Sequence, residues 1–106
     1  MSSEVAQTLA EITDQGIKRR GLGRLYTLKI LCGHGKAWST PGQVMKELNE
    51  YGTHTNYIFE LGGHYPQLVE MSPDKKLIRI RQKAHSELTK TIDRYITQAE
   101  QALKNR

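Results

Sequence analysis

Basic side chains gather in two stretches of the chain that contain no acidic residue. These stretches run from Gln15 to Lys46 and from Lys75 to His85, and they hold twelve of the sixteen Lys and Arg residues. The formal net charge is +5. Clustered cations can neutralise a polyanion, because each phosphate that they contact releases condensed counterions. The pattern indicates a polyanion-binding face, and the alternative is a solvated basic surface with no partner.

The second basic stretch lies in a segment that predicts a β-hairpin. Residues 68–71 (LVEM) and 76–82 (KLIRIRQ) are short strand-like runs, and residues 72–75 (SPDK) supply turn residues between them. Alternation along the second strand places Ile78 and Ile80 on one face and Arg79 and Arg81 on the other. We expect one side of the hairpin to pack on the core and the other to present bare cations.

Residue types that could support catalysis or metal binding are present but have no convincing spacing. The sequence lacks a P-loop, a Rossmann glycine signature, a G-x-S-x-G motif and an H-E-x-x-H motif. Cys32 lies on the apolar face of a predicted helix, where thiols are usually inert. Tyr26 and Trp38 are assigned to the core. We therefore predict no enzyme, no metal site and no cofactor.

Two helices are predicted in the first third of the chain. Residues 3–15 place apolar side chains at helical spacing. Residues 22–32 form a second, buried helix that Gly33 and Gly35 end. Between these helices, residues 18–24 (KRRGLGR) predict a basic bend that contains glycine.

The clearest local signal predicts a helix over residues 41–51. Thr40 is a natural N-cap, Pro41 occupies the first helical position, and Gln43 completes a capping box. The following residues, 53–61 (THTNYIFEL), favour a short helix ended by Gly62-Gly63 and Pro66. The same residues also suit a strand, because Thr, Tyr, Ile and Phe favour extended chain.

The last twenty residues predict a long helix with an apolar stripe. The stripe repeats at steps of three and four, as in a coiled coil. An apolar stripe that projects from a small domain needs a partner. We therefore predict a homodimer through this helix, and the alternative is a helix folded back on its own domain. The predicted dimerisation residues are Leu88, Ile92, Tyr95, Ile96, Ala99 and Leu103.

The order of these elements resembles the winged helix-turn-helix superfamily, especially small transcription regulators of the PadR and MarR kind. The resemblance rests on residues 39–48 (STPGQVMKEL), 53–61, 67–88 (QLVEMSPDKKLIRIRQKAHSEL) and the helix beyond, and it covers roughly residues 22–106. The segment GGHYPQ is about two residues longer than in the family pattern, which predicts a short recognition helix. The implied fold is α+β, a mostly helical winged helix-turn-helix with a β-hairpin wing and a long C-terminal dimerisation helix.

The resemblance implies a division of the chain and a set of DNA contacts. Residues 1–84 would form the DNA-binding domain, with an N-terminal helix and basic bend over 1–20, and residues 85–106 the dimerisation helix. Recognition residues would reach base edges, and the wing and bend would contact phosphates. The implied DNA-binding residues are Arg19, Arg20, Arg24, Thr53, His54, Thr55, Asn56, Tyr57, Lys75, Lys76, Arg79 and Arg81.

The resulting prediction is a homodimer that binds double-stranded DNA and regulates transcription. Two other functions stay open: a single-strand binder that stacks bases on Tyr57, Phe59 and Tyr65 of a small sheet, and a winged-helix module that binds another protein. The chain of 106 residues has one cysteine and no run of apolar residues long enough to cross a bilayer. We expect a cytoplasmic, nucleoid-associated protein with no membrane partner and no small-molecule cofactor.

Overall fold

The computed structural model describes residues 4–15, 19–51 and 58–104. It has α+β architecture, with a two-stranded antiparallel hairpin and a long C-terminal helix. The elements follow one another as α1 (Glu4–Gln15), α2 (Arg19–Gly33), α3 (Pro41–Leu48), a 3₁₀ turn (Asn49–Tyr51), α4 (Ile58–His64), β1 (Val69–Met71), β2 (Ile78–Ile80) and α5 (Gln82–Lys104).

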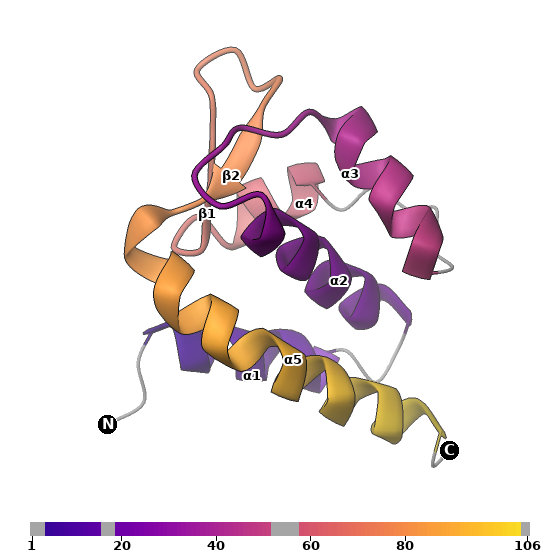
Figure 1. The fold of residues 1–106 in the computed structure, drawn as a ribbon. Helices are drawn as coiled ribbons and strands as arrows, with labels where there is room; N and C mark the ends of the chain where they lie inside the picture. The colour runs from indigo at the N-terminus through magenta and orange to yellow at the C-terminus, as the bar shows by residue number, and fades with distance from the viewer. Residues whose placement is uncertain (1–3, 16–18, 52–57, 105–106) are drawn as a thin grey trace.

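Helix α2 lies between two groups of elements. In Figure 1, α3 and the hairpin lie above α2, and α1 and α5 lie below it. Helix α5 packs on both α1 and α2, whereas β2 and α3 contact α2 from the other side. One hydrophobic core runs through all of these elements, from Val5 in α1 to Ala99 in α5. The boundary predicted after residue 84 therefore separates no second core, because α5 shares the core of the preceding residues.

Helix α3 begins where its sequence predicts, but it ends at Leu48, and a 3₁₀ turn replaces the predicted last turn over residues 49–51. Thr40 has an extended backbone, and its side chain accepts a hydrogen bond from the Gln43 backbone nitrogen at 3.2 Å. The Gln43 side chain accepts one from the Thr40 backbone nitrogen at 2.9 Å, which completes the capping box. Val44 and Leu48 are fully buried. These contacts fix where α3 begins and which face it turns to the core.

Helix α2 begins earlier than predicted. It starts at Arg19 and includes Gly21 and Gly23, so residues 19–24 are helical and the predicted bend is wrong for them. Leu25, Leu28 and Leu31 are at most 1% exposed. Burial of this apolar face against α5 and α3 outweighs the low helix propensity of glycine, which costs about 1 kcal/mol per residue.

The segment whose helix or strand character stayed open is helical where it is described. Helix α4 covers Ile58–His64, and Leu61 is fully buried. Residues 53–57 lie outside the described residues. A Cβ atom built on Gly62 would lie 2.7 Å from Met71 Sδ, so glycine permits the close approach of α4 to β1.

Candidate nucleic-acid interface

A backbone bridge joins the hairpin to the segment that precedes α3. The Ser39 backbone nitrogen donates to the Ile78 carbonyl oxygen at 2.9 Å, and the Ile78 nitrogen donates to the Ser39 carbonyl oxygen at 3.0 Å. Ser39 is fully buried. Thr40, the next residue, caps α3. The hairpin and the start of α3 are therefore held in a fixed relative position.

His34 strengthens the same junction. Its Nε2 donates to Glu47 Oε2 at 2.6 Å, and its Nδ1 is hydrogen bonded to Ser39 Oγ. A serine, a histidine and a carboxylate are the residue types of an acyl-transfer site. Here the serine is fully buried, so its hydroxyl cannot meet a substrate. The three side chains tie the end of α2 to α3.

The hairpin turn presents two lysines on an ordered backbone. Ser72 Oγ donates to Asp74 Oδ1 at 2.5 Å, and this contact lowers the Asp74 pKa. Asp74 Oδ1 also accepts from the Lys76 backbone nitrogen at 3.1 Å, and Lys75 has a positive φ of 61°. Lys75 and Lys76 are exposed, and neither forms an ion pair with another described residue. These two predicted DNA-binding residues are available to a partner.

The predicted bare arginines of β2 are instead held by one carboxylate. Ile78 and Ile80 are buried and Arg79 faces outward, as the alternation predicts. Glu70 lies opposite Arg79 in the strand register. Its Oε1 accepts from Arg79 Nε at 2.6 Å, and its Oε2 lies 3.5 Å from Arg81 Nη1. The expectation of unpaired wing arginines is therefore wrong.

Trp38 also contacts the group formed by Glu70, Arg79 and Arg81, which we call the Glu70 cluster. The Arg79 guanidinium carbon lies 4.0 Å from the centroid of the Trp38 ring, a cation–π contact. Trp38 is 36% exposed, so its assignment to the core is wrong, whereas Tyr26 is buried as predicted. The sequence pattern missed Glu70 and Trp38 because their roles depend on cross-strand and tertiary contacts.

Of the other predicted phosphate contacts, Arg24 is the one whose side chain is described. Arg24 is 7% exposed and lies 5.9 Å from the Tyr65 ring centroid, so it is too buried for the predicted role. The side chains of Arg19 and Arg20 lie outside the described part of the chain. The same holds for the whole of the predicted base-reading segment, Thr53, His54, Thr55, Asn56 and Tyr57.

The apolar stripe of α5 is covered within the chain. Leu88, Ile92, Ile96 and Ala99 are at most 6% exposed, and Tyr95 packs partly buried against the same core. The Leu103 side chain lies outside the described part. Helix α5 folds back on α1 and α2, which is the alternative that the sequence left open. The argument that this stripe needs a second chain is therefore wrong.

The small sheet that was the alternative surface for base stacking is not formed by the described residues. Residues 58–64 are helical, so Phe59 lies on a helix and the predicted sheet does not include it. Tyr65 is 5% exposed, and Tyr57 lies outside the described residues. Among the described residues, β1 and β2 of the hairpin form the only sheet.

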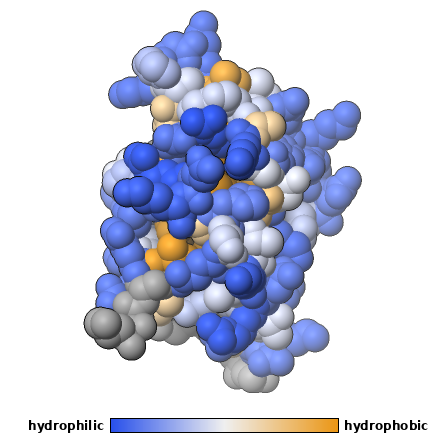
Figure 2. All heavy atoms as spheres, turned by 60° about the vertical axis from the view of Figure 1, so that its left-hand side comes forward, coloured by the Kyte–Doolittle hydropathy of each residue, from blue (hydrophilic) through white to orange (hydrophobic). Residues whose placement is uncertain are grey.

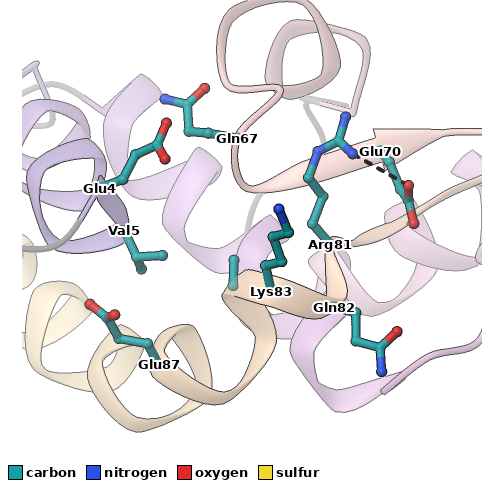
Figure 3. A pocket seen from close by; sticks show the side chains of 9 residues that line it. Glu4, Val5, Gln67, Glu70, Arg81, Gln82, Lys83 and Glu87 are labelled. Atoms are coloured by element: carbon teal, nitrogen blue, oxygen red, sulfur yellow. Dashed lines mark hydrogen bonds and ion pairs between the residues drawn. The ribbon is translucent and has the colours of Figure 1, made fainter.

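Two grooves flank the Glu70 cluster. The larger, about 750 Å³, lies between the start of α1, residue Gln67 and the start of α5. Figure 3 shows Lys83 reaching into it, with Glu4 on one side and Arg81 on the other. The smaller groove, about 480 Å³, lies between residues 35–36, β2 and the first turns of α5.

Hydrophilic residues cover most of the face drawn in Figure 2, and hydrophobic residues are visible there only in small separate areas.

Other chemistry at this site is limited by burial. Burial raises the pKa of the Cys32 thiol to about 11, which keeps it protonated near neutral pH. In the three described ranges, no group of three or more His, Cys, Asp or Glu side chains could hold a metal ion.

Known proteins provide no relative from which a function could be inferred for this chain. Among the described helices, none is long and apolar enough to cross a membrane. Searches against protein-family models, curated proteins and solved structures found no match to this chain.

Proposed function

We propose that this chain binds double-stranded DNA as a winged helix-turn-helix protein and acts in transcription regulation. The bridge between Ser39 and Ile78 supports this proposal most directly. It joins the capped start of α3 to the hairpin, so that both move as one body. In the proposed arrangement the hairpin is the wing and α3 leads into the recognition segment 53–61, so the bridge fixes the wing relative to the helix that precedes that segment.

Charge on the same side of α2 supports the choice of a polyanion. Four exposed lysines lie on or beside α3 and the hairpin, namely Lys36, Lys46, Lys75 and Lys76. Three of the nearby acids already have partners: Glu47 is bound by His34, Glu70 by the β2 arginines and Asp74 by Ser72. The lysines are thus left as the charges that a phosphate backbone meets first.

Titration of labelled oligonucleotides followed by fluorescence anisotropy tests the proposal. We expect the wild type to prefer duplex over single strand, with affinity that falls steeply between low and physiological salt. Lys75→Gln/Lys76→Gln should weaken duplex binding and reduce the salt slope by roughly one per lost phosphate contact. Lys90→Gln/Lys104→Gln removes the same charge from exposed sites on α5 and is the matched control.

Two results would contradict DNA binding through this face. One is the absence of duplex binding even at low salt. The other is an equal loss of affinity in the hairpin and α5 double variants, which would indicate that only net charge matters. Selection from random duplexes then tests the regulatory role, since a regulator should enrich one sequence.

A protein partner is the second candidate. Met45 on α3 and Tyr51 in the 3₁₀ turn are 37% and 39% exposed, and exposed apolar side chains that adjoin one another mark partner surfaces. If the wild type binds neither duplex nor single strand at low salt, this apolar edge becomes the favoured surface. The homodimer stays a prediction, and sedimentation at two protein concentrations tests it.

A further inference from the structure

The smaller groove combines walls from three separate parts of the chain. Gly35 and Lys36 come from the turn after α2, Arg79 and Ile80 from β2, and Gln82 and His85 from the start of α5. Its volume of about 480 Å³ falls in the range of small-molecule sites, roughly 300–1,000 Å³. A ligand here would contact groups that the tertiary fold has brought together.

Positive charge exceeds negative charge around this groove. Lys36 and Arg79 line it, and Glu70 is its one acidic lining residue. The Arg79 Nε–H group already donates to Glu70 Oε1. A guanidinium has five N–H donors, so Arg79 retains donors for an anion. The Trp38 ring, 4.0 Å away, restrains the guanidinium and lowers the entropy lost on binding.

His85 and Ser86 add polar groups from α5. His85 Nε2 lies 3.2 Å from the Cys32 carbonyl oxygen, and because a carbonyl only accepts, Nε2 carries the proton and donates. This contact orients the ring and leaves Nδ1 with no hydrogen-bond partner among the residues described. Ser86 lies one turn beyond Gln82, and both line the groove.

We propose that this groove binds a small organic oxyanion, a carboxylate or a phosphate ester, held mainly by Lys36 and Arg79. Ser86 supplies a further donor, and His85 Nδ1 does so when the ring is doubly protonated. Ile80 with the aliphatic part of Gln82 meets the organic body of the ligand. The groove shares Lys36 and Arg79 with the proposed DNA-binding face, but its lining includes neither Lys75 nor Lys76, so ligand binding measured without DNA is a separate test from duplex binding.

Calorimetric titration of the full chain, without DNA, tests this site with succinate and with glycerol 3-phosphate. We expect saturable binding of at least one probe, and the stronger of the two identifies the class of oxyanion. Lys36→Gln should weaken it about tenfold, as the loss of a charge-assisted hydrogen bond does. Lys90→Gln, which removes an exposed lysine outside the groove, should leave it unchanged.

His85→Gln supplies a second variant that preserves the fold. The Gln amide can still donate to the Cys32 carbonyl, but the Nδ1 position, which donates to an oxyanion when the ring carries a second proton, is gone, so probe affinity should fall while the unfolding midpoint stays close to wild type. The proposal is overturned if neither probe binds saturably, or if Lys36→Gln and Lys90→Gln bind alike.

Discussion

Glu70 holds Arg79 across the hairpin, with its Oε1 2.6 Å from Arg79 Nε. The two residues are directly opposite in the antiparallel register, where cross-strand side chains meet. The other Glu70 oxygen lies 3.5 Å from Arg81 Nη1, so one carboxylate faces two cations. Under the proposed function, a DNA phosphate has to compete with Glu70 for both arginines.

Replacing Glu70 should therefore strengthen DNA binding. Glu70→Gln keeps the size of the side chain and removes the competing charge. Duplex affinity should rise a few-fold, on the order of 1 kcal/mol, because exposed ion pairs are individually weak. Anisotropy titrations over a range of salt should also give a steeper slope.

Glu50→Gln is the control for this change, since Glu50 is exposed on the 3₁₀ turn and its loss alters net charge equally. A gain in Glu70→Gln no larger than that in Glu50→Gln would mean that the arginines are not released. Thermal unfolding should show both variants close to wild type.

Truncating the α5 stripe should cost stability within one chain. Ile92 is 2% exposed in the core, so Ile92→Ala should lower the free energy of unfolding by about 2–5 kcal/mol. Urea unfolding measures this loss. Lys90→Ala, two residues earlier and exposed, should change stability by less than about 0.5 kcal/mol. If Ile92→Ala instead halved the sedimentation mass at unchanged stability, the stripe would be intermolecular.

The two adjacent glycines of α4 should respond differently to alanine. Nothing lies within 4 Å of a Cβ built on Gly63, and its φ is not positive, so Gly63→Ala should stabilise by about 0.5–1 kcal/mol. A Cβ on Gly62 would meet Met71 Sδ at 2.7 Å, and displacing Met71 should offset that gain. Thermal unfolding should rank Gly63→Ala above Gly62→Ala. Equal midpoints would argue against the close packing of α4 on β1.

Cys32 should make stability fall at alkaline pH. Burial raises its pKa from 9.0 to about 11, so between these values the folded state retains a proton that the unfolded state has lost. The contribution of the buried, protonated thiol to stability is therefore complete below about pH 9 and is lost as pH rises toward 11, by up to ~3 kcal/mol. Urea midpoints of wild type and Cys32→Ala across this range isolate the thiol, since Lys and Tyr titrate in both. Parallel pH profiles would contradict the burial.

Local features of the fold followed from local residues. The helix at Thr40, Pro41 and Gln43 was predicted and is confirmed, because a capping box needs only side chains within one turn. The burial of Ile78 and Ile80 with Arg79 outward is also confirmed, since alternation is a property of any strand. The helix over residues 58–61 was the favoured choice and is observed.

The pairing of residues across the hairpin could not be predicted from neighbouring residues in the same way. A four-residue turn at 72–75 would place Leu77 opposite Glu70. The observed register places Arg79 there, because hydrogen bonds of Ser72 and Asp74 and the positive φ of Lys75 extend the turn to Leu77. Shifting the pairing by two residues keeps each face but changes every partner, so periodicity alone could not reveal the Glu70–Arg79 contact.

Helical periodicity predicts which residues of the last helix form an apolar stripe, whereas the packing of the folded chain establishes what covers that stripe. Periodicity shows which face of a helix is apolar. It does not show what packs against that face, which can be a second chain or the same one. Helix α5 is contiguous with its own domain, and α1 and α2 offer it an apolar surface at no cost in association entropy. Arg24 shows the same limit, because its charge was evident in the sequence and its burial depended on the packing around α2.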